Sequence, residues 1–434
     1  IRHYPDITHS RECQYPVPNW DVAFAITEGR EGINPRPLGE AQIIRQLQPY
    51  TLGSITYSEG CNDDVNKAIW SALEWDPEAD VTEALREYSR YYIGARYADT
   101  FAQGLLALER NWNGPLLTNA GVYTTLQQFQ AMEKAATPQD KLNWRFQQAL
   151  YRAYYDAYVR SRLLYEQGLE DRAMEALRAA PRAGSLTALA EAETLLDAAV
   201  THPVAQDWRA RVFELAEALY QSIRMQLSVE RYQAIAVERG ANLDSVDAPL
   251  NNRVWLKERF AELRRLPTES DRLQGIAEIV HWTDPGPGGY YDEPGSLTRR
   301  EHLLTGPGFE RDPGCYESVR VGFSGRAGRL AWARHAETLY DTPLQMRYTG
   351  LDPHAAYKIR VIYGGDERKV RLMAGPNIEV HPYLAKPAVT KPLEFDIPPA
   401  ATASGELTLS WMREPGLGGN GRGCQISEVW LIRK

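Results

Sequence analysis

The chain has 434 residues, of which 43% are hydrophobic and 24% are charged, an ordinary composition for a globular protein. Its net charge of −8 argues against a nucleic-acid partner, and no apolar run approaches the roughly 20 residues that a membrane span needs. At this length we expect two or three domains, each with its own core.

The cysteines carry no recognisable metal or disulfide pattern. Cys13, Cys61, Cys315 and Cys424 are scattered and form no CxxC pair, so neither a metal site nor a disulfide framework is predicted. No cofactor motif is found either. Cys13 and Cys61 fall in the same region, and their spacing leaves open whether they pair.

Residues 1–77 have the pattern of α/β structure. IRHYPDITHS is typical of a strand that runs into a loop, and TLGSITYSEG of the next strand, with a short amphipathic helix between them and another helix after them. The intervening QYPVPNWDVAF and REGINPRP are predicted as Pro-rich loops. This order suggests a parallel sheet, so we expect two parallel strands, near 1–7 and 52–58, that lead toward one common face. Two strands do not make a sheet alone, and the region is predicted to be the tail of a larger domain.

Residues 78–281 are predicted to form a helical domain. One helix should begin at the cap Asp80 and stop at Gly94, and a long one should begin at Thr137 and close at Gly168. The stretch HPVAQDWRARVFELAEALYQSIRMQLSVERYQAIAVERG is predicted as a single further long helix. Because no fixed period appears, a packed domain is favoured over a solenoid.

Residues 282–434 change character and predict a β-sandwich. After the Gly/Pro-rich stretch TDPGPGGYYDEPG, a linker or ordered loop, short β-rich runs such as SVRVGF, YKIRVIYGG and GELTLSWMRE alternate with turns. Alternation along the strands places Trp411 in the core and Trp430 on the opposite surface. There we expect Trp430 to pack on the helices, the alternative being a platform for a sugar ring. GLGGNGRG lacks the phosphate-loop pattern and is predicted as a turn between strands.

The stretch YSEGCNDDVNKAIW places three carboxylates where a strand gives way to a helix. If SITYSEG is a barrel strand, Glu59 lies at its C-terminal end, the face where barrel enzymes bind substrate. Glycosidases use paired carboxylates, so Glu59, beside Tyr57, is the candidate catalytic residue, the alternative being that it only binds a sugar hydroxyl. Asp63 and Asp64 fall in the first helical turn, where capping is the structural explanation. Asp63 is also a candidate substrate ligand, and Lys67 is spaced to pair with it.

A second cluster, HYPDITHS, places Tyr4, Asp6 and His9 at the end of the first strand and beyond it. These side chains and Tyr57 are predicted to reach the same face and to bind substrate. A histidine near a carboxylate serves as a general base or as a ligand for a hydroxyl group. The alternative is a hydrogen-bonded pair that only stabilises the loop. No nucleophile elbow appears in the sequence, which disfavours acyl transfer.

The run from Tyr57 to Gly94 resembles the junction between barrel and helical domain in a family of uncharacterised glycoside-hydrolase-like proteins. It is more distantly similar to α-glucuronidases. Residues 306–434 resemble a sandwich module of related proteins, most distinctively in LYDTPLQMRYTGLDP and GLGGNGRGCQISEVWLIRK. The resemblance implies a (β/α)8 barrel followed by a helical domain. A full barrel needs about 250 residues, so residues 1–77 are expected to be its end, with further strands upstream of Ile1.

Taken together, the sequence predicts a multidomain α+β protein with a partial barrel (1–77), a helical domain (78–281) and a carbohydrate-binding-like sandwich (282–434). The resemblance implies a secreted or periplasmic glycosidase that acts on a polysaccharide or oligosaccharide once its barrel is complete. The rival function is a non-catalytic carbohydrate-binding or scaffold protein, and a structural assembly subunit has least support. An open pocket around Glu59 and Asp6 would favour catalysis, and burial in ion pairs would favour binding or structure. The sequence specifies neither the sugar, the linkage, the stereochemical outcome nor the oligomeric state.

Overall fold

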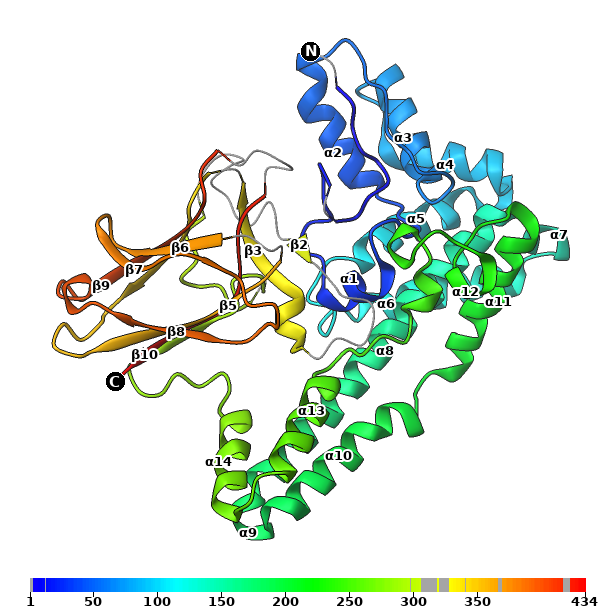
Figure 1. Ribbon diagram of the computed structural model, residues 1–434. Helices are drawn as coiled ribbons and strands as arrows, with labels where there is room; N and C mark the ends of the chain where they lie inside the picture. Colours follow the sequence, from blue (N-terminus) through cyan, green and yellow to red (C-terminus); the bar gives the residue numbers. More distant parts are fainter. Residues whose placement is uncertain are drawn as a thin grey trace. The chain divides into compact units, whose positions relative to one another are not determined.

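The chain forms two compact units that are each built from more than one segment. The computed structural model describes residues 3–11, 13–296, 298–305, 318–319, 328–339, 341–365, 369–416 and 422–434 (Figure 1). The first unit comprises Ile1–Gln167 with Ala199–Leu250, and the second Gly168–Ala198 with Asn251–Lys434. Helices and antiparallel sheets together confirm a multidomain α+β protein. The predicted helical region 78–281 is divided between the units, and the three-domain boundaries stay a prediction.

The first unit is largely helical. Asp80 caps α4 as predicted, because its side chain accepts the backbone N–H of Glu83 at 3.0 Å. In α3, Ile69 and Leu73 are both buried, one turn apart on the same face of the helix. Every helix in the described part of the chain is too short or too polar to cross a bilayer. The α-helices of this unit are α1 (Val22–Glu28), α2 (Pro37–Leu47), α3 (Asp64–Trp75), α4 (Val81–Tyr92), α5 (Ala98–Asn111), α6 (Gly121–Ala135), α7 (Pro138–Lys141), most of α8 (Trp144–Arg178), α11 (Gln206–Ile223) and α12 (Val229–Tyr232).

Two extended segments near the N-terminus pair in parallel, in the orientation that the sequence predicts. Parallel bridges join His3 to Ser54 and Asp6 to Tyr57. The backbone N–H of Tyr57 donates to the carbonyl of Pro5 at 2.7 Å. The contacts are isolated bridges rather than continuous strands, so they do not show a barrel. They do bring the residues after both segments to one edge.

Buried polar side chains along α8 tie the first unit together. Arg152 is 1% exposed, lies 3.8 Å from the ring centre of Trp112 and donates to Asp156 at 3.1 Å. The hydroxyl of Tyr155 donates to the carbonyl of Thr27 at 2.6 Å and to that of Asn242 at 2.9 Å. These bonds fasten α1 and the 199–250 segment to the same helix, which is what brings the site residues described below together.

Three predicted boundaries are wrong. The helix expected from Thr137 to Gly168 is two helices, because α7, capped by Thr137, ends at Lys141 and α8 begins only at Trp144. Helix α8 then continues through Gly168, where an added Cβ would meet open space, and ends at Arg178. A glycine inside a helix costs only about 1 kcal/mol, which the packing of a long helix offsets. The expected helix over 202–240 stops after α11, where Arg224 turns left-handed at φ 58°. QYPVPNWDVAF is not all loop, because Asp21 caps α1.

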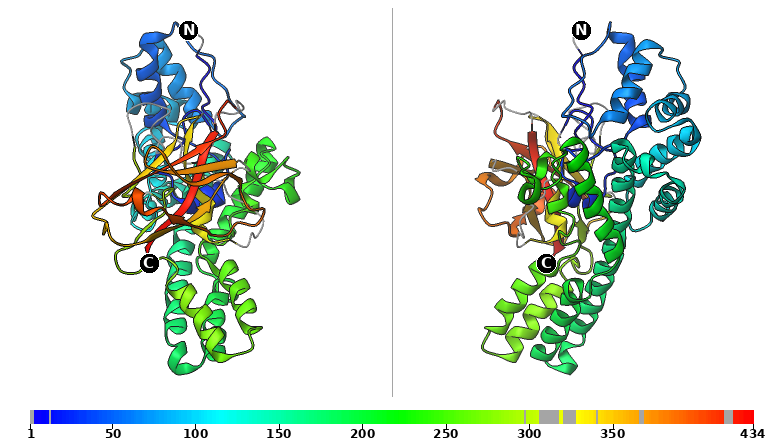
Figure 2. Two further views of the ribbon diagram at one scale, coloured as in Figure 1. Left: turned by 60° about the vertical axis from the view of Figure 1, so that its left-hand side comes forward. Right: turned by 90° about the vertical axis from the view of Figure 1, so that its right-hand side faces the viewer.

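The second unit contains a small helical bundle (Figure 2). Its core consists of small, branched and aromatic apolar residues, among them Leu177, Leu189 and Phe260, all fully buried. Such close-packed apolar faces supply most of the stability of short helices. The bundle is formed by the C-terminal end of α8 together with α9 (Ala180–Ala183), α10 (Ser185–Thr201), α13 (Arg253–Arg264) and α14 (Glu269–Val280).

Two antiparallel sheets complete the second unit. Among the described residues, six strands form one sheet, in the order β2-β3-β10-β5-β8 with β1 also on β10, and four form the other, in the order β4-β9-β6-β7. β1 lies within the stretch that was predicted as a linker or ordered loop. The strands are β1 (Tyr290–Asp292), β2 (Ser318–Val319), β3 (Arg334–Leu339), β4 (Leu344–Thr349), β5 (Tyr357–Tyr363), β6 (Lys369–Ala374), β7 (Ile378–Ala385), β8 (Leu393–Ile397), β9 (Glu406–Arg413) and β10 (Arg422–Arg433).

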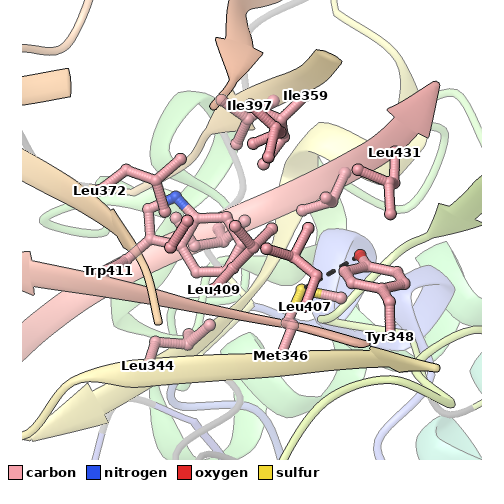
Figure 3. Packing of buried hydrophobic residues seen from close by; sticks show 14 of the residues in the cluster. Leu344, Met346, Tyr348, Ile359, Leu372, Ile397, Leu407, Leu409, Trp411 and Leu431 are labelled. Carbon is pink, nitrogen blue, oxygen red and sulfur yellow. Dashed lines mark hydrogen bonds between the residues drawn. The ribbon is translucent and has the colours of Figure 1, made fainter. Parts of the chain in front are cut away.

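Both sheets contribute to one hydrophobic core. Leu409 and Trp411 of β9 face Ile359 of β5 and Leu431 of β10, from the other sheet (Figure 3). A core shared by two sheets is the arrangement that a β-sandwich requires. Cys315, most of SVRVGF and residues 417–421 of GLGGNGRG lie outside the described residues.

The two tryptophans lie where strand alternation places them. Trp411 is fully buried in the shared core, and Trp430 is 1% exposed on the other face of its sheet. The Trp430 indole donates to the carbonyl of Trp282, 2.8 Å away, just after α14. Trp282 packs against the core of the helical bundle, which confirms the predicted aromatic contact between sheet and helices. Glu428, fully buried nearby, accepts from Tyr291 at 2.6 Å, and burial raises its pKa.

Candidate functional site

The parallel segments end at a group of charged side chains arranged around one histidine. His9 Nδ1 lies 2.5 Å from an Asp6 oxygen, and Nε2 lies 3.0 Å from Oε1 of Glu31. Oε1 of Glu59 is 3.8 Å from the same Nε2. Arg239 contacts both glutamates, and we call these five residues, Asp6, His9, Glu31, Glu59 and Arg239, the His9 cluster.

The loop after the first segment is built so that His9 points into this cluster. One Asp6 oxygen accepts the backbone N–H groups of Thr8 and His9, each at 3.1 Å, which closes a tight turn. The hydroxyl of Thr8 accepts the backbone N–H of Glu59 at 2.9 Å and donates to Asp63. The loop-stabilising role left open by the sequence is therefore present. It leaves the second ring nitrogen of His9 directed at two further carboxylates.

Two members of the cluster, Glu31 and Arg239, were not predicted from the sequence. Glu31 lies in the loop after α1, within a stretch predicted only as Pro-rich. Arg239 ends a short 3-10 helix, Val237–Arg239, and its Nε is 3.0 Å from Glu31 while NH2 donates to Glu59 at 2.9 Å. In the sequence, the feature that could have pointed to Glu31 is its place between Arg30 and Gly32, in a polar loop that directly follows a helix.

The electrostatics of the cluster favour charged forms of both partners in the His9–Asp6 pair. Burial acts to lower the pKa of His9, but the hydrogen bonds that its ring donates to Asp6 and Glu31 outweigh burial and raise that pKa above its ordinary value. Burial likewise acts to raise the pKa of Asp6, and the bonds from His9 overcome it and lower the pKa. Each partner thus stabilises the charged form of the other.

Aromatic side chains border the cluster. Tyr57 stacks on the His9 ring with centroids 5.6 Å apart and an interplanar angle of 19°, and its hydroxyl donates to Glu59. That hydrogen bond, with some burial, raises the pKa of Tyr57 to about 12. Tyr4 meets Tyr57 edge-on at 6.1 Å and is 45% exposed. The candidate residues Tyr4, Asp6, His9, Tyr57 and Glu59 are thus brought together.

The two aspartates after Glu59 are engaged by other side chains of the first unit, and the role of Asp63 as a substrate ligand stays a prediction. Asp63 is fully buried, and its predicted pair with Lys67 is present at 2.9 Å. It occupies the N-cap of α3 but its side chain makes no capping bond, so that part of the prediction is wrong. The reason is that its oxygens are taken by Thr8, Lys67 and Ser58. Asp64 instead pairs with Arg145 at 2.7 Å.

A cavity in the first unit lies apart from the cluster. It is lined by residues that include Asp64, Tyr88 and Arg145, and by no member of the His9 cluster. Glu59 and Asp6 are each 17% exposed and engaged in ion pairs, the arrangement that favours binding or structure over catalysis. Cys13 and Cys61 are free thiols and do not pair with each other.

The comparisons with known proteins show a distant structural likeness. No model of a protein family matches the chain, and no curated protein does. Among solved structures the chain is similar to "a novel family GH115 4-O-methyl-alpha-glucuronidase, BtGH115A, with specificity for decorated arabinogalactans", at 11% identity and a TM-score of 0.27. The match covers 99% of this chain and 51% of that one, so the chain spans about half the length of its structural neighbour. A likeness this weak carries no argument about function.

Proposed function

We propose that the chain is part of a glycoside-hydrolase-like protein whose His9 cluster contacts a polysaccharide or oligosaccharide. The observation that carries the proposal is the exposed ring of Tyr4 beside Tyr57 and a set of carboxylates. A sugar presents an apolar C–H face, which stacks on an aromatic ring, and hydroxyl groups, which carboxylates and His9 bind. The cluster offers both kinds of contact at one edge.

Within this proposal, Glu59 is the residue in contact with substrate. It is more exposed than Glu31, at 17% against 3%, and it lies at the end of the second parallel segment. Retaining glycosidases hold two carboxyl groups about 5–5.5 Å apart. Glu31 and Glu59 have oxygens within 4.8 Å of each other, so two carboxylates stand side by side here, somewhat closer than in such a pair. Residues 1–77 are then the end of a barrel, and the two sheets form a carbohydrate-binding-like sandwich.

A non-catalytic carbohydrate-binding protein is the second candidate function. Arg239 neutralises both glutamates, and Glu31 is almost fully buried, which are properties of a fixed binding site. In that case Glu59 and His9 position a sugar hydroxyl and no bond is cleaved. The two functions share the site and differ only in whether the sugar is hydrolysed.

Release of reducing ends from a panel of plant and microbial polysaccharides separates the two. If the chain hydrolyses one of them, Glu59→Gln should lower turnover by orders of magnitude and leave the melting temperature nearly unchanged. The matched control is Glu78→Gln, an exposed glutamate outside the cluster. Normal turnover in Glu59→Gln, with a large loss of stability, would show that Glu59 is only structural. Binding of a polysaccharide without release of reducing ends would select the non-catalytic function.

A further inference from the structure

We propose that the His9 cluster binds a divalent transition-metal cation, best matched by Zn²⁺, through one atom each of His9, Glu31 and Glu59. Their nearest ligand atoms all lie within 4.8 Å of one another. In a tetrahedral zinc site with bonds of about 2.0–2.2 Å, neighbouring ligand atoms are separated by about 3.4 Å. The distances from His9 Nε2, 3.0 Å to Glu31 and 3.8 Å to Glu59, lie on either side of that value.

The histidine is oriented as a metal ligand is. A ligating histidine commonly donates its other ring N–H to a carboxylate, which fixes the tautomer and aims the second nitrogen at the metal. Here Asp6 lies 2.5 Å from Nδ1 and is itself held by two backbone N–H groups of its own turn. Nε2 is therefore directed at the two glutamates by a partner that is fixed in place.

Arg239 now supplies the positive charge that a bound metal cation would supply to Glu31 and Glu59. Its guanidinium is the group in contact with both glutamates, and its side chain is the most exposed of the cluster at 41%. It extends from a single-turn helix followed by Gly240, so withdrawal of the side chain into solvent disturbs little packing. A bound cation would take over its role of neutralising Glu31 and Glu59. The metal and Arg239 thus compete for Glu31 and Glu59. We therefore predict that removal of the Arg239 side chain tightens metal binding.

The choice of metal follows from the ligands. One imidazole and two carboxylates suit Zn²⁺, which takes nitrogen and oxygen ligands in a small coordination number. Ca²⁺ requires 6–8 oxygen ligands, more than this cluster offers. The proposal goes beyond the proposed function, because the cation can be measured in the absence of any saccharide.

Isothermal titration of the full chain with ZnCl2 after treatment with a chelator tests the proposal. We expect one Zn²⁺ per chain and no heat from CaCl2. Glu31→Gln and Glu59→Gln should each weaken binding at least about tenfold, and Asp6→Asn about 10–100-fold through loss of histidine orientation. Arg239→Met should tighten binding about tenfold or more, because a like charge beside the metal is removed. Glu238→Gln, an exposed neighbour on the same short helix, is the matched control and should leave affinity unchanged.

Folding of each variant is checked by circular dichroism without metal, and Glu59→Gln carries the test if the buried Glu31→Gln does not fold. Absence of stoichiometric Zn²⁺ binding in both the unaltered chain and Arg239→Met would overturn the proposal. Binding that persists unchanged in Glu59→Gln and Asp6→Asn would place the metal elsewhere and overturn it equally. Failure to bind a saccharide would leave these results unaffected, so the two proposals stand or fall separately.

Discussion

Glu40 is a buried carboxylic acid whose removal should change how stability depends on pH. It lies in the first turn of α2, is fully buried, and neither oxygen has a hydrogen-bond partner among the described residues. Burial raises the pKa of Glu40 to about 8, and the charge of Arg36 only partly opposes this. The folded protein therefore holds a proton there that the unfolded chain releases from about pH 4.5 upward.

The sign and size of the effect follow from linkage. Because the folded state binds the proton more tightly, the stability present below pH 4.5 is lost as the pH rises toward the folded pKa of about 8. Each pH unit in that window corresponds to about 1.4 kcal/mol, so at pH 7 the loss is on the order of 3 kcal/mol. Glu40→Gln keeps the size of the side chain and removes the titration. The variant should therefore gain on the unaltered chain as the pH rises.

Urea unfolding at pH 5, 6, 7 and 8, followed by circular dichroism, measures this gain. We expect the difference in unfolding free energy between Glu40→Gln and the unaltered chain to grow by about 1 kcal/mol per pH unit in favour of the variant. Glu78→Gln, exposed on the surface, should give a curve parallel to that of the unaltered chain. A difference that does not change with pH, or that grows toward low pH, would refute the reasoning.

Two further predictions concern packing and capping. Trp430→Ala should destabilise the protein by about 3–5 kcal/mol, because it empties a buried site against Trp282. The control Trp75→Ala, at a residue that is 92% exposed, should change stability by less than about 0.5 kcal/mol. Equal melting temperatures for the two variants would contradict the packing of Trp430. Asp80→Ala should cost about 1 kcal/mol through loss of the bond to Glu83, and an unchanged midpoint of urea unfolding would show that α4 does not need its cap.

Structural features that depend on residues close together in the sequence were predicted correctly. The cap at Asp80, the buried face of α3 and the opposite placement of Trp411 and Trp430 all follow from spacing along the chain. The parallel orientation of the first two segments also followed, because a helix between two strands returns the chain in the same direction. For the cap, the helix face and the two tryptophans, the residues that decide the structure are neighbours in the sequence.

The complete membership of the His9 cluster could not be predicted, because the residues that determine it are far apart in the sequence. Arg239 lies 180 residues from Glu59 in the sequence, and its contact depends on the path of the whole 199–250 segment. Glu31 joins the cluster because Tyr155 of α8 fixes the end of α1 nearby. The capping prediction for Asp63 failed for the same reason, since Thr8, 55 residues earlier, competes for its oxygens. The local sequence pattern carries no information about which distant side chains will contact a given carboxylate.

The proposed saccharide contact at the His9 cluster is tested most directly by isothermal titration of the full chain, in the presence of a chelator, with a panel of oligosaccharides. We predict millimolar or tighter binding to at least one of them, lost in Tyr4→Ala and in Glu59→Gln and retained in Glu78→Gln, with all three variants folded. Binding that is unchanged in both Tyr4→Ala and Glu59→Gln, or the absence of binding across the panel, would contradict the assignment of this cluster to a sugar.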